Sequence, residues 1–411
     1  MIMDCNKVYF KLKSSCSVNG WIVSILTLSA LSYHCLAFQR HPFWFSRIEN
    51  EYPQCAKMTT YNSFEGHSSP FLSSQRLFSA PLNSPSSLKL LNQTNENFLI
   101  DDSRVPELYC ACQDTRPNIH WIEASSGIDV DTSLTPVIIL HGMFGSSRNF
   151  LGWAKTLPLM LKRPRQVFLV DLRNHGQSDW HESMTLEDLT CDVCGFMEEL
   201  DIPKAIFIGH SIGGKIACNM ALKKPRLVDG LMVLDIAPVT YNLEKDSQWR
   251  EVVTNLQKLN QLPLATITSK QQADRLLMEA IPDDAKRAFC LQQLQPDPTT
   301  KRLRWVLNIK ALADNVDHLG SFDTRDIEQQ NAYHQEVLFV AGGKSRFLRS
   351  SHLPIIAALF PNFKLITIRD TGHWLHIDAA ERTLELAKAY IERDGWKPGH
   401  KVGQKPFFYY S

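Results

Sequence analysis

The sequence predicts an α/β fold in which helices flank a mostly parallel central sheet. From Glu107 onward, short apolar runs alternate with helix-like stretches, as strands and crossover helices do in such folds. Residues 239–335 interrupt this alternation, because they are polar, helix-prone and free of strong strand signals. A stretch of this length is too long for a simple crossover, so we expect a helical cap inserted between two strands.

Each expected element rests on a local pattern. Strands are expected where short apolar runs lie between turn signals, and helices where apolar residues recur at helical spacing. The helix that begins at Ile212 ends at Lys223, because Pro225 cannot continue it. The expected strands are 108–113, 119–123, 137–140, 167–171, 205–208, 230–235, 336–340 and 363–368, and the expected helices are 149–161, 186–200, 212–223 and 378–393.

Composition and charge limit the classes of protein that the chain can represent. Its 411 residues allow one large domain with extensions or two small domains, and 44% apolar residues are typical of a protein with a sizeable core. Because the 44 basic side chains are nearly balanced by 43 acidic ones, we expect no nucleic-acid partner. We place the folded domain at residues 107–394, followed by a basic, aromatic tail at 395–411. The sequence does not indicate an oligomeric state.

The ten cysteines form no framework of disulfide or metal spacing. Cys191-x-x-Cys194 lies in a helix-like stretch and lacks a second pair of ligands at a suitable distance along the chain. We therefore expect no metal site.

The N-terminus has the pattern of a targeting leader. Basic residues precede the apolar segment 21–31, and Cys35 and Ala37 are small residues at the two positions that a signal peptidase inspects. The apolar segment is too short to prefer crossing a bilayer, which takes about 20 residues. We expect a cleaved signal peptide at residues 1–37 and no stable membrane span in the mature protein.

Residues 38–97 continue the leader with a segment rich in serine and poor in acidic residues, which is typical of a transit peptide. A signal peptide followed by a transit-like segment that begins at Phe38 resembles the bipartite plastid-targeting leader of algae with secondary plastids. The sequence therefore predicts a plastid protein. An endomembrane or secreted protein with a disordered spacer, and a mitochondrial protein, are the alternatives.

Gly209-His210-Ser211-Ile212-Gly213 follows the expected strand 205–208 and opens the next helix. A G-x-S-x-G sequence at this place is the pattern of a nucleophile elbow, a sharp turn that exposes the serine at the edge of a sheet. The two glycines let the strand and the helix approach the turn. Ser211 is therefore the candidate nucleophile, and the Ile212 N–H faces the same space.

Two further loops follow expected strands. His141-Gly142-Met143-Phe144-Gly145 follows strand 137–140 and is the type of loop that supplies a second oxyanion-binding N–H, here that of Met143. His373 lies in a loop after strand 363–368, where a general base belongs.

These motifs, in this order, resemble those of the α/β-hydrolase superfamily, and more narrowly of the small serine esterases related to YbfF and to abhydrolase domain-containing protein 11. The resemblance spans residues 135–391 and implies the α/β-hydrolase fold. It rests on five motifs, which are His141-Gly142-Met143-Phe144-Gly145-Ser146, Asp171-Leu172-Arg173-Asn174-His175-Gly176-Gln177-Ser178, Gly209-His210-Ser211-Ile212-Gly213-Gly214-Lys215, Leu234-Asp235-Ile236-Ala237-Pro238 and Gly372-His373-Trp374-Leu375-His376.

The acid of a catalytic triad is less obvious. In many α/β-hydrolases it follows the strand that ends here near Val340, but the loop 342–346 has no carboxylate. The resemblance to YbfF-like esterases implies Asp235, which can reach His373 because both follow strands of the same sheet. Asp314 and Asp317 are the alternatives.

The expected chemistry is hydrolysis of a small-molecule acyl ester or thioester through an acyl-enzyme, with Ser211 as nucleophile, His373 as base and no cofactor. Two other functions remain open, a ligand-binding protein without hydrolytic activity and an acyltransferase that uses an acceptor other than water.

Six more residues are expected to shape or support the pocket. His141 braces the oxyanion loop, His210 packs against the elbow and His376 supports His373. The other three border the pocket or pack beside it, and they are Gly142, Asn174 and Trp374.

Overall fold

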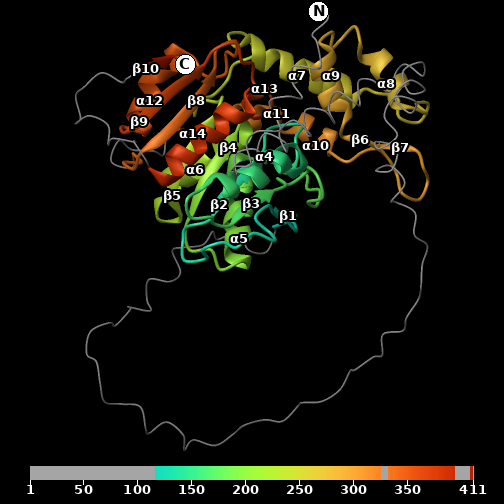
Figure 1. Cartoon of the computed structure of the whole chain (residues 1–411). Coiled ribbons are helices and arrows are strands. Elements are labelled where there is room, and N and C mark those ends of the chain that lie inside the picture. The colour runs from blue at the N-terminus through green and yellow to red at the C-terminus, as the bar shows by residue number, and fades with distance from the viewer. Residues whose placement is uncertain (1–115, 325–331, 394–407, 411) are drawn as a thin grey trace, which may run out of the picture. The chain divides into compact units, whose positions relative to one another are not determined.

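The computed structural model describes residues 116–324, 332–393 and 408–410. An eight-stranded sheet with the order β1-β3-β2-β4-β5-β8-β9-β10 forms the centre (Figure 1). β1 pairs antiparallel with β3, and the other neighbours are parallel, so the predicted fold class is confirmed. The strands of this sheet are β1 (Trp121–Glu123), β2 (Val137–Leu140), β3 (Val167–Val170), β4 (Ala205–His210), β5 (Val228–Leu234), β8 (Val337–Gly342), β9 (Phe363–Ile368) and β10 (Phe408–Tyr410).

Helices cover both faces of the sheet. α5, α6 and α12 pack on one face, and α4 and α14 on the other. Short 3₁₀ turns precede β5 and α12. The helices are α4 (Ser147–Met160), α5 (Leu186–Glu199), α6 (Ile212–Lys223), α7 (Ser247–Asn260), α8 (Lys270–Leu277), α9 (Asp284–Leu291), α10 (Ile309–Asp314), α11 (Val316–Gly320), α12 (Leu353–Leu359), α13 (Leu375–Asp378) and α14 (Ala380–Glu392).

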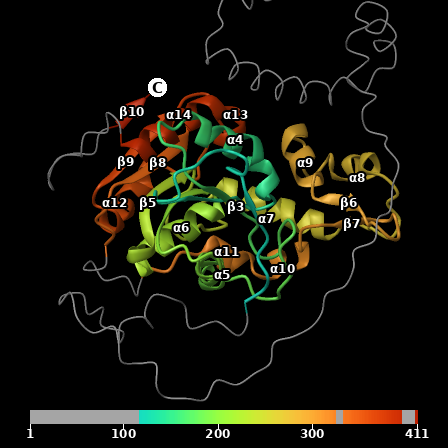
Figure 2. The ribbon, with the colours of Figure 1, turned by 60° about the horizontal axis from the view of Figure 1, so that its bottom comes forward.

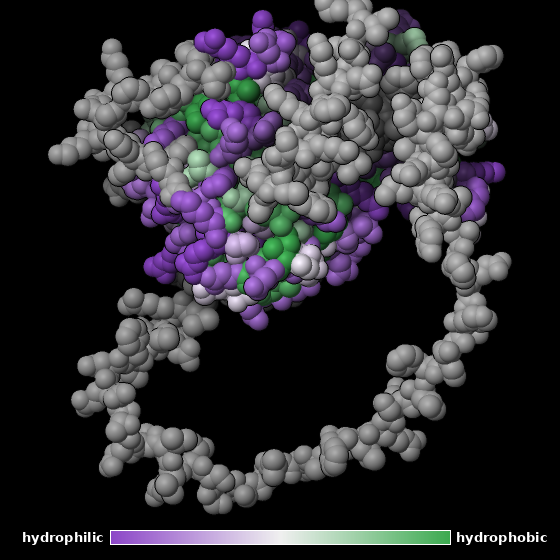
Figure 3. All heavy atoms as spheres, in the orientation of Figure 1, coloured by the Kyte–Doolittle hydropathy of each residue, from purple (hydrophilic) through white to green (hydrophobic). Residues whose placement is uncertain are grey.

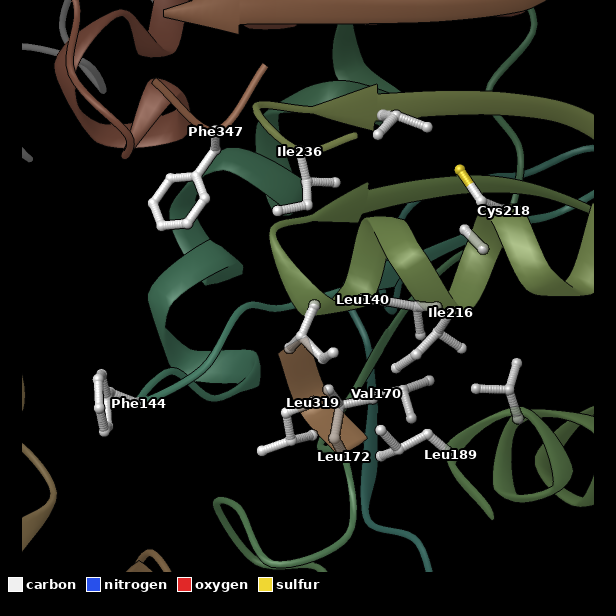
Figure 4. Close-up of a cluster of buried hydrophobic side chains, with 14 of the residues drawn as sticks. Leu140, Phe144, Val170, Leu172, Leu189, Ile216, Cys218, Ile236, Leu319 and Phe347 are labelled. Carbon is white, nitrogen blue, oxygen red and sulfur yellow. The ribbon is translucent and has the colours of Figure 1, made fainter. Parts of the chain in front are cut away.

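Alternation along the strands divides the core in two. In β2, Ile138 and Leu140 join the cluster under α5 and α6, whereas Val137 and Ile139 join the cluster under α4 and α14. All four are fully buried, as expected for a strand of a sheet covered on both faces. Figure 4 shows part of the first cluster, in which Leu140 lies near Val170 of β3 and Ile216 of α6.

The segment between β5 and β8 contains helices α7 to α11, of which α8 and α9 lie to one side of the sheet in both ribbon views (Figures 1 and 2). It also contains a feature that the sequence did not predict, an antiparallel hairpin of β6 (Leu294–Pro296) and β7 (Leu303–Trp305). Strands of three residues are too short to give a recognisable alternation. The insertion is therefore mostly helical, with one small hairpin.

Helix α12 was not predicted either, and further differences lie at the ends of the domain. Phe408–Tyr410 extends the sheet beside β9, although residues 395–411 were expected to follow the domain as a tail. The predicted signal peptide (1–37), the transit-like segment (38–97) and the expected strand 108–113 lie outside the described residues. Within the described ranges, no helix is both long and apolar enough to cross a bilayer. Polar residues cover much of the visible face, with apolar patches between them (Figure 3).

The approach of α6 to β2 fixes where the elbow can lie. A Cβ on Gly213, in the first turn of α6, would lie 2.4 Å from the backbone oxygen of Leu140. Only a residue without a side chain allows this approach, because neither backbone can move away cheaply. The start of α6 is therefore held against the carboxyl end of β2.

The space around two helical glycines predicts opposite effects of replacing each with alanine. Gly213→Ala should lower the free energy of unfolding by about 2 kcal/mol or more, since it forces backbone atoms apart. Gly152→Ala, at an exposed position of α4 with open space around it, should raise that free energy by roughly 0.5–1 kcal/mol. Urea unfolding monitored by circular dichroism measures both. A Gly213→Ala protein as stable as the wild type would contradict the tight approach.

Candidate active site

A cavity of about 370 Å³ opens at the carboxyl ends of the parallel strands. Its floor comes from loops that follow β2, β4, β5, β8 and β9, and its walls come from α7, α9 and α11 of the insertion. Aromatic side chains form much of the wall, and they are Phe144, Trp249, Phe289, Phe347 and Trp374. Most of the lining is therefore apolar, as in typical small-molecule sites.

Ser211 lies on this floor, directly after β4. Its backbone adopts φ 54° and ψ −124°, the strained conformation expected of an elbow, and its N–H donates to the Leu234 carbonyl at 3.1 Å. Gly142 lies close beside it, since a Cβ there would be 2.9 Å from Ser211 Cβ. The serine is thus held between the ends of β2 and β5.

His373 and Asp235 form a hydrogen-bonded pair. His373 Nδ1 lies 2.7 Å from Asp235 Oδ2, and Asp235 Oδ1 accepts the Gly342 N–H at 2.9 Å. Asp235 is fully buried directly after β5, and the His373 side chain is 19% exposed in the loop after β9. With Nδ1 donating to the carboxylate, His373 Nε2 is left as a proton acceptor.

Ser211 and His373 line the same cavity. Both are among the described residues, and their side chains form no hydrogen bond with each other. Such bonds often tighten only when a substrate is bound. The two alternative acids lie elsewhere. Asp314 forms an ion pair with Lys310 and has a side chain that is 56% exposed, and Asp317 is also exposed. Asp235 is therefore the carboxylate that contacts His373.

The two expected oxyanion donors, the amides of Met143 and Ile212, belong to residues that line the cavity. Ile212 is the first residue of α6, so its N–H has no acceptor within the helix. Beside Met143, Phe144 adopts a positive φ of 65°, and its carbonyl accepts a hydrogen bond from Gln293 Nε2 at 3.1 Å. The insertion thus helps to hold the oxyanion loop.

Two buried histidines lie next to His373. His210 lines the cavity, its Nε2–H donates to the His373 carbonyl at 2.9 Å, and its ring centroid lies 4.7 Å from that of His373. His376 stacks on Phe150 at 3.8 Å. Burial lowers the pKa of His210 well below its usual range and that of His376 to about 3, and the nearby His373 adds to both shifts. Both rings are therefore neutral near pH 7.

The remaining expected residues have different positions. Trp374 lines the cavity and packs against Phe289 at 4.8 Å. His141 and Asn174 are buried and do not belong to its described lining. His141 Nδ1–H donates to the Gly142 carbonyl at 2.9 Å and so braces the oxyanion loop. Asn174 joins its loop to the start of α10 by accepting the Asn308 N–H at 2.9 Å.

Lys215 is a site residue that the sequence analysis did not single out. It is 1% exposed, lines the cavity, and donates from Nζ to three carbonyls, those of Leu319, Gly320 and Ser321, at 2.7–3.2 Å. Burial lowers the pKa of Lys215 to about 7. Its place one helical turn after Ser211, in a helix that is otherwise uncharged before Lys223, is the signal that could have revealed it.

Comparison with known proteins identifies relatives of this chain. Residues 135–380 match the family described as "alpha/beta hydrolase fold". The "sn-1-specific diacylglycerol lipase ABHD11" of Xenopus laevis is 30% identical over 293 residues, which cover 69% of this chain and 90% of the relative. The "Esterase YbfF" of Escherichia coli (strain K12) is 26% identical, with 62% of this chain and 93% of that protein covered. The structure of a "Marine microorganism esterase" superposes with a TM-score of 0.59 at 27% identity, covering 67% and 99%.

The buried state of His376 predicts a pH effect on stability. Unfolded His376 takes up a proton near pH 6.5, whereas the folded residue does so only near pH 3. Its depressed pKa therefore contributes stability above pH 6.5 that is lost as the pH falls. His376→Leu should reduce the stability loss between pH 7 and pH 4 by roughly 3 kcal/mol. Urea unfolding of both proteins at the two pH values measures this. An equally steep loss in the variant would show that folded His376 is readily protonated.

Proposed function

The chain belongs to the α/β-hydrolase family and is a carboxylic ester hydrolase, and we propose that it cleaves its ester or thioester substrates through an acyl-enzyme on Ser211. The observation that carries this proposal is the hydrogen bond to the buried Asp235 from His373, which lines the same cavity as Ser211. This arrangement supplies a nucleophile, a base and an orienting carboxylate.

The proposed reaction has two steps. Ser211 Oγ attacks the acyl carbonyl while His373 Nε2 takes its proton, and Asp235 holds the imidazole tautomer and stabilises the imidazolium. The imidazolium then gives the proton to the departing alcohol or thiol, which leaves the acyl group on Ser211. Water attacks the acyl-enzyme by the same route, and the carboxylic acid and free Ser211 result. The Met143 and Ile212 N–H groups are the proposed donors to the oxyanion in both steps.

The cavity also supports a substrate class. Apolar and aromatic side chains make up most of the lining of the cavity, whereas charged groups such as the ion-paired Glu251 and Lys286 lie on α7 and α9. An apolar acyl group fits the aromatic part of the wall, because burying it there releases water from both surfaces. We propose an apolar acyl chain bound to a more polar alcohol or thiol.

A fluorophosphonate probe tests the activated serine. Protein lacking its first ~95 residues should be labelled, and Ser211→Ala and His373→Ala should abolish labelling. Asp235→Asn should slow it by up to about 10⁴-fold, since the orienting carboxylate is lost. Asp314→Asn is the matched control, because the same change at an exposed, ion-paired aspartate should leave the rate unchanged.

Three results would change the proposal. Folded wild-type protein that resists the probe would favour a ligand-binding protein. Labelling that persists in Asp235→Asn but falls in Asp314→Asn would move the acid to the insertion. Release of an acyl ester rather than free acid, when an alcohol is added with a p-nitrophenyl ester, would identify an acyltransferase.

For the location, we propose that residues 1–97 direct the protein to a plastid. The support is the order of a signal-like segment at 1–37 and a serine-rich segment beginning at Phe38. A fluorescent protein fused to residues 1–100 should enter the plastid of an alga with a secondary plastid, and mature protein should begin at or beyond Phe38. Reticular, secreted or mitochondrial fluorescence would reject the plastid without affecting the proposed chemistry.

A further inference from the structure

Tyr241 connects the turn after Asp235 to the loop after β8. Its side-chain oxygen accepts the Ala237 N–H at 3.0 Å and donates to the Phe347 carbonyl at 2.5 Å, and the residue is 5% exposed. Ala237 lies two residues after Asp235, in the same turn. One hydroxyl group therefore ties the loop of Phe347 to the turn that carries the acid.

The Phe347 side chain lies directly on the proposed base. Its ring centroid is 4.3 Å from that of His373, with an angle of 38° between the planes, and Phe347 is 5% exposed. Tyr241 also touches this ring edge-on, at 5.6 Å and 80°. Both Phe347 and Ile236 of the acid turn line the cavity and are drawn in Figure 4. The position of Phe347 thus sets part of the wall against which the imidazole rests.

Tyr241 is also fixed from the insertion and from α6. Its backbone N–H donates to the Gly320 carbonyl at 2.9 Å, at the end of α11. The same carbonyl accepts a hydrogen bond from Lys215 Nζ at 2.7 Å, and Nζ lies 4.9 Å from the centre of the Tyr241 ring. Contacts from three separate segments therefore define the place of this side chain.

We infer that Tyr241 is a positioning residue that, through Phe347, holds the His373 imidazole in its reactive orientation. The inference rests on the proposed function, in which His373 is the base. Residues 343–349, which carry Phe347, form neither helix nor strand, so no helical or strand-pairing hydrogen bond holds the Phe347 carbonyl, and the Tyr241 hydroxyl is a partner that binds it. Loss of the hydrogen bond from Tyr241 frees the Phe347 ring to shift away from His373. The imidazole can then rotate about its remaining contact, because the hydrogen bond to Asp235 holds only Nδ1.

The chain offers a closely matched control for removing this hydroxyl. Tyr390 is also 5% exposed, and its side-chain oxygen likewise accepts one backbone N–H, of Leu231 at 2.7 Å, and donates to one carbonyl, of Glu336 at 2.7 Å. Leu231 lies in the middle of β5 and Glu336 directly precedes β8, so both partners lie away from the carboxyl ends that carry the site. Tyr390→Phe therefore removes the same bonds at the same burial without touching His373.

The experiment compares Tyr241→Phe, Tyr390→Phe and the wild type in the full chain. Both variants should lose thermal stability to a similar extent. Tyr241→Phe should slow fluorophosphonate labelling of Ser211 by about 10- to 100-fold, as expected for a misplaced catalytic group, whereas Tyr390→Phe should stay within about twofold of the wild type. Phe347→Leu, which keeps the carbonyl that Tyr241 binds but removes the ring, should also slow labelling.

A second readout does not depend on activity. The proton between His373 and Asp235 should give a downfield NMR resonance, which Tyr241→Phe should shift or broaden and Tyr390→Phe should leave in place. Equal labelling rates in the two tyrosine variants, or a resonance that Tyr241→Phe leaves unchanged, would overturn the inference. A wild type that resists the probe while its resonance responds only to Tyr241→Phe would instead refute the proposed function and retain the positioning role.

Discussion

The buried carboxylate of Asp235 is the constraint on which the rest of the site depends. An unpaired charge in this position would cost several kcal/mol, so its partners must be in place when the chain folds. The partners are the N–H of Gly342, the last residue of β8, and the ring of His373 after β9, and the Asp235 N–H in turn donates to the carbonyl of Val340 in β8 at 2.8 Å. Satisfying one carboxylate therefore aligns the ends of three neighbouring strands.

Parallel strand order brings the remaining groups to the same edge. β2, β4, β5, β8 and β9 are neighbours in the sheet and run in one direction, so the residues that follow them meet, although the first and the last of these residues are more than two hundred positions apart in the chain. The insertion then closes this edge and is itself tied to it, because Lys215 of α6 binds the carbonyls at the end of α11 and Gln293 binds Phe144. The cavity wall and the site beneath it are thus one connected structure.

The sequence was informative where the signal is local. The strand before Ser211, the glycines around it and the helix after it occur within some twenty residues, and the structure places all of them as predicted. Pairing Asp235 with His373 needed the resemblance to a family as well as the shared sheet edge. The contacts of Lys215, Tyr241 and Phe347 could not be predicted, because each depends on a loop or helix end far along the chain. The hairpin β6–β7, helix α12 and strand β10 escaped for a related reason, since short elements are set by tertiary packing more than by their own pattern.

The neutral histidines beside His373 fit the proposed reaction on electrostatic grounds. When His373 accepts the proton of Ser211 it becomes positive, and a second positive ring at 4.7 Å would oppose that step. Burial lowers the pKa of His210 and His376 and so keeps these rings neutral. His210 can then act as a hydrogen-bond donor to the backbone of His373 without adding charge, while Asp235 provides the negative charge that stabilises the imidazolium. The burial of His210 and His376 therefore leaves His373 as the histidine of this group that becomes charged during the reaction.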